Sequence, residues 1–298
     1  MEPNQSLRTF DGAVAIVTGG ASGIGRALGE ALARRGARVV LADLQVDLAN
    51  EVATQIRKNG GQAIGEELDV ADFPSTKRLI EDTFLRENRL DYIFNNAGIA
   101  ILGEARLYQI EDWYRVLDVN LRGVIHGLQA AYPIMLRQGF GHIVNTASLA
   151  GLFPYALIAG YCTSKHAVVG LSLSVRLEAA AEGVRVSVLC PGPVWTQALI
   201  NGGKYGKMLQ PYPPEALKRI VELQHPIRPE QFAERALRAV ARNRAVIVIP
   251  SRWKALWWFY RLSHGLALCL GRKGTEIAKR TLERFPTEPA PDDLAPKS

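Results

Sequence analysis

Short strand-like runs alternate with longer helical patterns over the first 250 positions of the chain. The strand-like runs lie at residues 13–17, 37–42, 62–68, 90–94, 141–146, 184–189 and 245–249. Between them, apolar residues recur at helical spacing over residues 25–35, 45–58, 72–87, 110–136, 157–182 and 230–242. Strands that alternate with helices form right-handed βαβ units, in which successive strands lie parallel. The pattern therefore predicts an α/β fold, a doubly wound parallel sheet flanked by helices.

One stretch breaks this alternation. Residues 193–229 contain Gly202, Gly203 and several prolines, and an irregular stretch of this length inside a compact domain is usually a lid or a binding loop. We therefore expect residues 1–250 to form one domain in which 193–229 is the substrate loop. The chain then continues as an aromatic and basic helical extension over residues 251–285. A proline-rich tail over residues 286–298, for which we expect a flexible conformation, ends it.

A glycine-rich loop, Thr18-Gly19-Gly20-Ala21-Ser22-Gly23-Ile24-Gly25, follows the first strand. Gly19 permits a tight turn, Gly23 lets the backbone approach a pyrophosphate, and Gly25 allows the next helix to pack closely on the sheet. The N-terminus of that helix supplies N–H groups and a positive dipole for phosphates. Asp43 ends the second strand, where a carboxylate can accept both hydrogen bonds of an adenosine ribose diol. The motif indicates a dinucleotide site; the alternatives are a plain turn and an Asp43 that only caps the next helix.

Tyr161 and Lys165 are four residues apart in the helical pattern at 157–182 and so share one helix face. A nearby ammonium favours phenolate over phenol, which lowers a tyrosine pKa from its usual value of about 10. A tyrosine of this kind can exchange a proton with an alcohol or a carbonyl near neutral pH. The spacing alone arises often by chance in amphipathic helices, so the interpretation depends on the other motifs.

Taken together, the motifs resemble those of the short-chain dehydrogenase/reductase family. The resemblance extends over about residues 10–250 and rests on Thr18-Gly-x-x-x-Gly-x-Gly25, Asn95-Asn96-Ala97-Gly98, Asn120, Ser148, Tyr161-x-x-x-Lys165, and Pro191-Gly192 with Thr196. It implies a Rossmann-type fold and a nicotinamide cofactor. It also implies that the domain at 1–250 both binds the dinucleotide and carries the catalytic residues.

The resemblance implies a role for each matching residue. Tyr161 is the acid/base that relays the proton of the reacting hydroxyl, Lys165 lowers its pKa and holds the nicotinamide ribose, and Ser148 binds the substrate oxygen. Asn120 ties Lys165 to a water chain. The alternative for Ser148 is a local turn at the end of a strand. The residues expected to bind the cofactor are Thr18, Gly19, Ser22, Gly23, Ile24, Gly25, Asp43, Leu44, Asp69, Val70, Asn96, Ala97, Gly98, Tyr161, Lys165, Pro191, Gly192, Val194 and Thr196.

These assignments predict the interconversion of a secondary alcohol and a ketone. We expect NAD rather than NADP, because Asp43 would repel a 2′-phosphate and neither Ser22 nor Leu44 offers a cation there. Arg38, the nearest cation, begins the strand that Asp43 ends. The candidate substrate-pocket residues are mostly apolar or aromatic, which favours a bulky hydrophobic substrate of steroid, retinoid, terpenoid or lipid type. They are Ala100, Phe153, Tyr155, Trp195 and Leu199, with Leu102, Leu157 and Tyr205 as further candidates.

Two other classes of function stay open: a dinucleotide-binding scaffold without turnover, and a membrane-surface interaction protein whose catalytic core is vestigial. The composition, 48% hydrophobic and 22% charged, is typical of a soluble globular protein, and neither a signal peptide nor a nucleic-acid-binding face is expected. Cys162, Cys190 and Cys269 are scattered without metal-ligand spacing, which favours a reducing compartment. We therefore expect no metal site and a cytoplasmic location.

The positive charge is concentrated in the extension. Residues 252–284 contribute a surplus of +6 to the net charge of +7, and the same segment holds clustered tryptophans. The segment is too polar to span a bilayer, but its composition is that of an interfacial helix. Either these aromatic residues pack on the protein, or the extension makes a peripheral contact with an anionic membrane. Relatives pair through helices that correspond to 110–136 and 157–182, so the resemblance also implies at least a homodimer; the extension could cover a second interface near the last strand.

Overall fold

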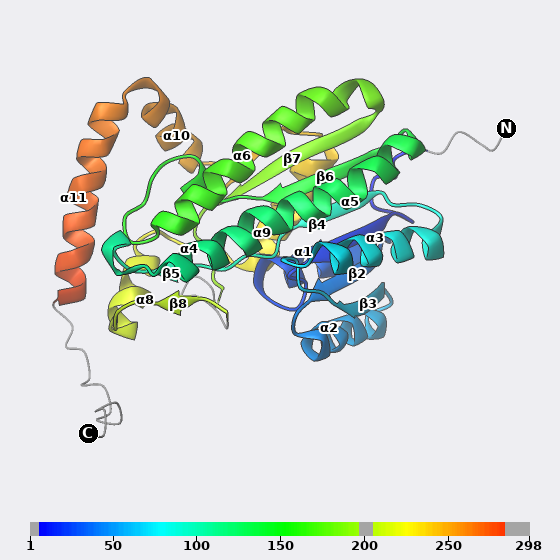
Figure 1. Ribbon diagram of the computed structural model, residues 1–298, viewed down its shortest axis with the longest axis horizontal. Helices are drawn as coiled ribbons and strands as arrows, with labels where there is room; N and C mark the ends of the chain where they lie inside the picture. The colour runs from blue at the N-terminus through cyan, green and yellow to red at the C-terminus, as the bar shows by residue number, and fades with distance from the viewer. Residues whose placement is uncertain (1–5, 197–204, 284–298) are drawn as a thin grey trace.

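The computed structural model describes residues 6–196 and 205–283 of the chain. Its centre is a seven-stranded parallel sheet in the order β3-β2-β1-β4-β6-β7-β9 (Figure 1). The strands are β1 (Val14–Thr18), β2 (Arg38–Asp43), β3 (Gln62–Glu67), β4 (Tyr92–Asn95), β6 (Gly141–Thr146), β7 (Val184–Pro191) and β9 (Val246–Ile249). All seven predicted strands are present, and the predicted Rossmann-type α/β fold is confirmed.

Helices cover both faces of the sheet. One face carries α1 (Gly23–Ala33), α2 (Val46–Lys58) and α9 (Pro229–Ala241), and the other carries α3 (Phe73–Glu87), α5 (Gly123–Gln138) and α6 (Ala159–Ala179). The central strand β1 shows why the strands of this sheet are continuous runs of apolar residues in the sequence. Ala15 and Val17 of β1 pack in the layer toward α1, whereas Val14 and Ile16 pack in the layer toward α5. A strand buried on both faces has no polar side to alternate with.

The strand order reverses at β1, because the chain builds outward to β3 on one side and then returns to β4 on the other. In a parallel α/β sheet, the crevice outside the carboxyl ends of the strands at such a point is where ligands bind. The fold therefore places the glycine loop after β1, Asp43 at the end of β2 and Asn95 at the end of β4 around one opening.

The predicted helix at 110–136 is continuous in outline but consists of three parts. α4 (Ile110–Leu117) leads into a π-helical turn, η2 (Asp118–Arg122), and then into α5. Single π-helical turns inside longer helices occur frequently at functional sites. Hydrophobic spacing alone did not predict this turn, which contains Asn120. Elsewhere in the described residues, the chain forms three short 3-10 turns: η1 (Ala105–Leu107), η3 (Leu149–Gly151) and η4 (Ala180–Glu182).

The stretch at 193–229 is more ordered than the sequence predicted. It contains α8 (Pro214–Glu222) and the short strand β8 (Lys207–Met208), which pairs with β5 (Ile101–Leu102). Proline suits the first position of a helix, and α8 buries Ala216 and Val221. The expectation of an irregular stretch was therefore wrong for this part.

The extension is helical, but a break at Ser263 divides it into α10 (Trp253–Leu262) and α11 (His264–Glu283). α10 packs against β9, and α11 runs away from the sheet to contact α8 (Figure 1). Within the described ranges, no helix has the length and apolar character needed to cross a membrane. The predicted flexible tail at 286–298 lies outside the described residues.

Candidate active site

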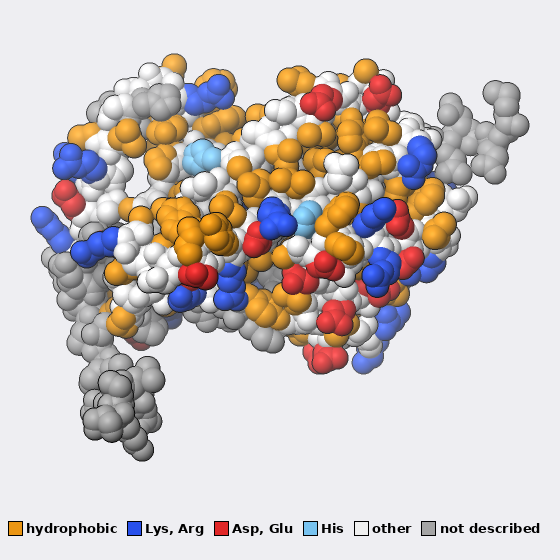
Figure 2. Space-filling model, viewed as in Figure 1, with side chains coloured by type: hydrophobic (Ala, Val, Ile, Leu, Met, Phe, Trp, Pro, Cys, Tyr) orange, Lys and Arg blue, Asp and Glu red, His pale blue; other side chains and the backbone are white. Residues whose placement is uncertain are grey.

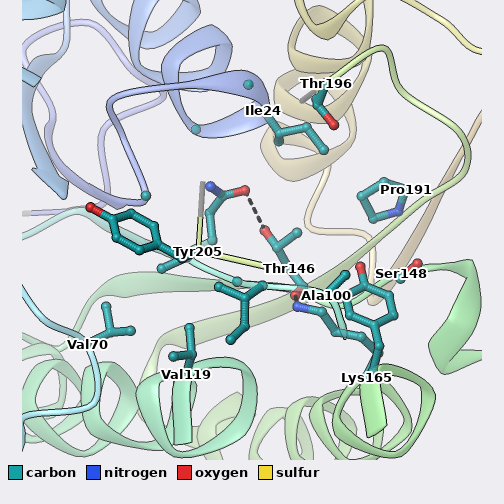
Figure 3. A pocket seen from close by; sticks show the side chains of 18 of the residues that line it. Ile24, Val70, Ala100, Val119, Thr146, Ser148, Lys165, Pro191, Thr196 and Tyr205 are labelled. Carbon is teal, nitrogen blue, oxygen red and sulfur yellow. Dashed lines mark hydrogen bonds between the residues drawn. The ribbon is translucent and has the colours of Figure 1, made fainter. Parts of the chain in front are cut away.

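A cavity of about 1180 Å³ opens at the carboxyl ends of the central strands (Figure 3). Pockets for one small ligand usually measure about 300–1,000 Å³, so this volume suits a dinucleotide together with a substrate. Every residue expected to bind the cofactor lines this cavity except Thr18. Figure 3 shows Ser148 and Lys165 at one end, Ile24 and Thr196 on the wall above them, and Val70 at the far end.

The glycine loop has the shape that a dinucleotide requires. Gly19 has a φ of +65°, a conformation that side-chain-bearing residues rarely adopt. A Cβ on Gly25 would lie 2.0 Å from the carbonyl oxygen of Gly19, so only glycine lets α1 begin this close to the turn. The loop thereby presents the N-terminus of α1 to the cavity, where backbone N–H groups and the helix dipole favour phosphate.

Thr18 serves the site from outside the cavity. Its hydroxyl oxygen accepts hydrogen bonds from the backbone N–H groups of Asn96 (2.9 Å) and Ala97 (3.0 Å). The Asn96 side chain in turn donates to the Thr18 carbonyl (3.1 Å) and accepts from the Thr146 hydroxyl (3.3 Å; Figure 3). Thr18 therefore lies outside the cavity lining, where it fastens the Asn96 turn to the glycine loop.

Asp43 is buried, and two backbone groups hold its carboxylate. Oδ2 accepts from the N–H of Ala21 and Oδ1 from the N–H of Gln45, each at 3.0 Å. Asp43 and Gln45 line the same end of the cavity as Leu44, Asp69 and Val70. Arg38 forms an ion pair with Glu87 at 2.9 Å, so this cation is engaged away from Asp43. Along the described lining of the cavity, the basic side chains are Arg115 and Lys165, which come from α4 and α6.

The predicted catalytic residues Ser148, Tyr161 and Lys165 come together at the opposite end. The hydroxyls of Ser148 and Tyr161 are hydrogen-bonded to each other. Lys165 is buried, and its ammonium lies 5.5 Å from the centre of the Tyr161 ring and donates to the Thr146 carbonyl at 2.8 Å. Ser148 also accepts from the N–H of Ala150 (3.1 Å), the local turn that the sequence left as an alternative. The turn and the contact with Tyr161 therefore coexist.

The electrostatics of this group differ from the expectation in one respect. Burial raises the pKa of Tyr161, and the hydrogen bond from Ser148 is the main opposing influence. The expected lowering by Lys165 is not among the influences on the Tyr161 pKa, and the Lys165 ammonium donates its hydrogen bond to the Thr146 carbonyl. Burial also lowers the pKa of Lys165 to about 8, since an ammonium without a carboxylate partner is costly in this environment.

Asn120 lies behind the cavity, in the π-helical turn, and is fully buried. Its side-chain oxygen accepts from the N–H of Ile99 (2.8 Å), and its amide donates to the Ile99 carbonyl (2.9 Å) and to the Ser164 hydroxyl (3.1 Å). A Cβ on Gly98 would lie 3.2 Å from the Asn120 oxygen and 3.4 Å from the Lys165 ammonium. Asn120 thus holds the segment after β4 against α6, next to the lysine.

The predicted substrate pocket is only partly assembled from the expected residues. Ala100 and Tyr155 line the cavity, as do Leu102 and Tyr205, whereas Leu199 lies outside the described residues. Phe153 does not line it: the ring is buried against Tyr155 and Tyr260. Trp195 lines a separate hollow beside Arg26 and Pro229. Leu157, with a φ of +68°, is also outside the lining. Cavity residues that sequence reasoning missed include Leu149, Ile158, Glu111, Tyr114, Arg115 and Gln224.

Some of these missed residues had a signal in the sequence. Leu149 directly follows Ser148, and Ile158 precedes the Tyr161 helix, so proximity to the motifs pointed to both. Tyr114, Arg115 and Gln224 had none, because they reach the site through the packing of α4 and the return of the substrate loop. Across the described part of the chain, no group of three or more His, Cys, Asp or Glu side chains is arranged to hold a metal ion.

Comparison with known proteins gives the class of this fold and site. The family model for short chain dehydrogenase matches residues 13–204. Cyclohexanol dehydrogenase of Acinetobacter sp. is 36% identical over 221 residues, which cover 71% of this chain and 87% of that protein. Meso-2,3-butanediol dehydrogenase of Serratia marcescens is 35% identical over 193 residues, covering 65% of this chain and 75% of that protein.

A solved structure agrees over nearly the whole length. A short-chain dehydrogenase/reductase from Burkholderia phymatum, in complex with NAD, superposes with a TM-score of 0.75 at 30% identity and covers 95% of this chain and 99% of that one. The chain therefore belongs to the short-chain dehydrogenase/reductase family. It is an oxidoreductase of this family, whose members bind a nicotinamide dinucleotide.

Proposed function

We propose that this protein interconverts a secondary alcohol and a ketone with NAD as the cofactor. The observation that carries the proposal is the meeting of Ser148, Tyr161 and Lys165 at one end of a cavity whose other end has a glycine loop and a buried Asp43. The relatives named as cyclohexanol and butanediol dehydrogenases favour the same reaction. A dinucleotide-binding scaffold without turnover would not need a tyrosine, a serine and a buried lysine in contact at this point.

The residues of the site suggest how each would act. A bound nicotinamide would accept or supply the hydride at the ring. In the oxidation direction, Ser148 donates a hydrogen bond to the substrate oxygen, and the phenolate of Tyr161 takes up the hydroxyl proton. Lys165 places a positive charge beside that phenolate and stabilises it. In the reduction direction the Tyr161 phenol returns its proton to the carbonyl oxygen.

We further propose a hydrophobic substrate. On the Tyr161 side, the cavity lining is mainly apolar or aromatic; its members include Ala100, Leu102, Leu149, Tyr155, Ile158 and Tyr205. Such a surface favours an apolar ring or chain beside the reacting carbon, because transfer of apolar area out of water is favourable. A cyclic alcohol, and bulkier alcohols of steroid, terpenoid or lipid type, fit this description.

The proposed reaction can be tested with Tyr161→Phe. The wild-type protein should reduce NAD in the presence of a panel of cyclic and lipophilic secondary alcohols, as measured by the absorbance of reduced nicotinamide. Tyr161→Phe should lower kcat by about a thousandfold while cofactor binding persists, since proton transfer is lost but the rest of the site remains. Tyr132→Phe is the matched control and should retain activity, because Tyr132 is a partly buried residue of α5 that packs against the core and does not line the cavity. Retention of more than about a tenth of the turnover in Tyr161→Phe would exclude Tyr161 as the acid/base.

We also propose that the protein is a homodimer. Figure 2 shows hydrophobic side chains on the face formed by α4, α5 and α6. Exposed large apolar residues of these helices are Ile110, Tyr114, Ile125, Leu136 and Leu177. Exposed apolar side chains gathered on one face are typical of a subunit interface. Packing of α10 on β9 supports the related idea that the extension covers the edge near the last strand.

A peripheral contact with an anionic membrane is the second proposal for the surface. One side of α10 packs on the protein through Trp253, Trp257 and Tyr260, and the other side exposes Trp258 and Leu262 next to Arg261. Both interpretations of the aromatic cluster are therefore supported by different residues of the same helix. Exposed tryptophan and leucine beside arginine are typical of helices that lie in the membrane interface.

A further inference from the structure

The inner side of α10 reaches the back of the active site. A Cβ built on Gly192 would lie 3.0 Å from both Cδ1 and Nε1 of Trp253 and 3.2 Å from Cδ1 of Leu149. Gly192 and Leu149 both line the cavity, whereas Trp253 does not. The indole of Trp253 therefore packs against these two segments from the side that faces away from the cofactor.

The two segments are central to the chemistry. Leu149 directly follows Ser148 and begins the turn η3, and Gly192 follows the end of β7 in the segment that leads to Val194 and Thr196. Trp253 shares one apolar cluster with Leu149 and Cys190, which adjoin Ser148 and Pro191. A single side chain from the extension thus supports both the segment that binds the substrate oxygen and the segment expected to hold the nicotinamide.

Neighbouring contacts fix the start of α10 in place. Arg252 donates to the carbonyl oxygens of Gln224 (2.9 Å) and His225 (2.7 Å), and its guanidinium lies 5.8 Å from the centre of the Trp253 ring. The substrate loop returns to the sheet at these carbonyls. There Ile227 donates to the Pro193 carbonyl (3.1 Å) and accepts from the N–H of Trp195 (3.0 Å). The start of α10 therefore holds the returning end of the substrate loop, and Ile227 joins that end to the beginning of the loop.

The Trp253 ring is held by packing contacts. Its Nε1 is buried and has no hydrogen-bond partner among the described residues, so the ring contributes packing at this position and not a hydrogen bond. If packing is what matters, phenylalanine should replace tryptophan with little loss, whereas alanine should leave a void behind Gly192.

We infer that Trp253 is a positioning residue for hydride transfer: it keeps Gly192 and Ser148 at the separation the reaction requires, without touching cofactor or substrate. The inference rests on the proposed function. A misplacement of reacting groups by about 1 Å can lower a rate by about a hundredfold, so loss of this support should act on turnover more than on binding. The adenosine end of the cavity, around Asp43, is far along the sheet from Trp253 and should be unaffected.

The experiment compares Trp253→Ala with Trp253→Phe and with Trp257→Ala as the matched control. Trp257 is on the same helix and in the same cluster but is not among the atoms nearest to Gly192. Trp253→Ala should lower kcat by about tenfold or more, with the KM for NAD changed by less than about threefold. Calorimetric titration with ADP-ribose, which lacks the nicotinamide, should give the wild-type Kd. Trp253→Phe should restore kcat to within about threefold of wild type. Trp257→Ala should keep its kcat even where its Tm falls as far as that of Trp253→Ala.

The possible outcomes separate the inference from the function on which it rests. Wild-type kcat in Trp253→Ala, failure of Trp253→Phe to restore turnover, or an equal loss in Trp257→Ala would each overturn the positioning role. Weakened ADP-ribose binding in Trp253→Ala would also overturn it, because it would indicate a general loss of structure. If the wild-type protein neither binds NADH nor turns over any alcohol, the proposed function fails, and the inference fails with it.

Discussion

Two opposite influences act on the proton of Tyr161. Burial favours the neutral phenol, and the Ser148 hydrogen bond is the main influence in the other direction. Lys165, by contrast, has a pKa lowered to about 8 by burial, so its charge is lost as the pH rises through that value. The site is thus built so that an incoming ligand changes the balance: a hydroxyl that hydrogen-bonds the phenolate stabilises the charged form. If the proposed reaction is correct, such a ligand would let Tyr161 act as a base although burial raises its pKa in the free protein.

Asp43 leads to the first residue-scale prediction, a preference for NAD. With its carboxylate fixed by the N–H groups of Ala21 and Gln45, Asp43 cannot turn away from a 2′-phosphate. We expect kcat/KM with NAD to exceed that with NADP by at least about tenfold, which corresponds to about 1.4 kcal/mol. Asp43→Ser should reduce this ratio mainly by improving the reaction with NADP. Steady-state kinetics with both cofactors measures it.

A second variant, Asp43→Asn, separates the effect of the charge on cofactor preference from the effect of the loop hydrogen bonds on stability. Asp43→Asn removes the charge but keeps an oxygen that can accept one of the two backbone hydrogen bonds. Asp43→Asn should therefore relax the cofactor preference with a smaller loss of Tm than Asp43→Ser. Equal catalytic efficiency of the wild-type protein with NAD and NADP would contradict the prediction.

At the scale of elements, the sequence predicts the strands and helices whose burial produces a hydrophobic pattern. It misses the features that depend on tertiary packing. The strand Val14–Thr18 is predictable because both of its faces are buried. The helix α8 was missed because it is short and lies among prolines. The β5–β8 pair was missed because strands of two residues are too short to show an alternation of apolar and polar positions. Most motif residues of the site line the cavity, whereas Thr18, Asn95 and Asn120 lie behind it, and the sequence predicted these residues from the spacing of the motifs. Phe153 was expected in the substrate pocket, but its direction depends on Tyr260 of the extension, which no local pattern reveals.

Strand β6 contains a buried histidine that should make stability depend on pH. His142 donates to or accepts from the Ser187 hydroxyl through Nε2 (2.9 Å), with Arg185 and Arg176 nearby. Burial, and then these two cations, lower the pKa of His142 from 6.5 to about 3. The unfolded chain therefore binds a proton in this window that the folded protein does not. The contribution of the neutral His142 to the free energy of unfolding should be fully present above pH 6.5 and should be lost as the pH decreases toward about 3.

Urea unfolding between about pH 6 and about pH 4 tests this, because one such proton changes the free energy of unfolding by about 1.4 kcal/mol per pH unit. His142→Gln, which can still bond Ser187 but cannot be protonated, should show a shallower loss over this range. An identical slope in the wild-type protein and in His142→Gln would show that other groups cause the acid sensitivity.

At the scale of the whole molecule, the exposed face of α6 predicts how two copies would pair. The outward stripe of this helix consists of Thr163, His166, Gly170, Ser174 and Leu177. Among the described residues, nothing beyond the nearby backbone of α6 lies within 4 Å of a Cβ built on Gly170, so this small residue leaves the helix surface open to a partner. Small residues at such a position allow two helices to approach closely. We expect a dimeric mass by light scattering at micromolar concentration.

Gly170→Arg gives a sharp test of that interface. Within one protomer the new side chain meets open space, and arginine is a better helix former than glycine by about 0.8–1 kcal/mol. The variant should therefore keep its fold and Tm while its mass falls to that of a monomer. A monomeric wild-type protein would contradict the homodimer, and a variant that stays dimeric would place the interface elsewhere.

The extension carries the last prediction, binding to anionic membranes. Trp258 and Leu262 are 58% and 83% exposed, and the nearby Arg261 guanidinium lies 6.0 Å from the centre of the Trp258 ring. Burying these two side chains in a lipid interface would be favourable, and the basic surplus of residues 252–284 would add attraction to anionic headgroups. Because exposed charges are screened by salt, co-sedimentation with anionic vesicles should be clear at low salt and weak at high salt.

The variant Leu262→Ser separates this contact from the packing role of α10. Leu262 is on the outward side, so its loss should weaken vesicle binding while activity toward a water-soluble alcohol stays unchanged. Neutral vesicles should bind less than anionic ones in every case, because they lack the charge that attracts arginine and lysine. Absence of binding to anionic vesicles at low salt would leave α10 with the single role of packing on the protein. In that case the exposed Trp258 would need another partner, and a second copy of the chain would be the first to test.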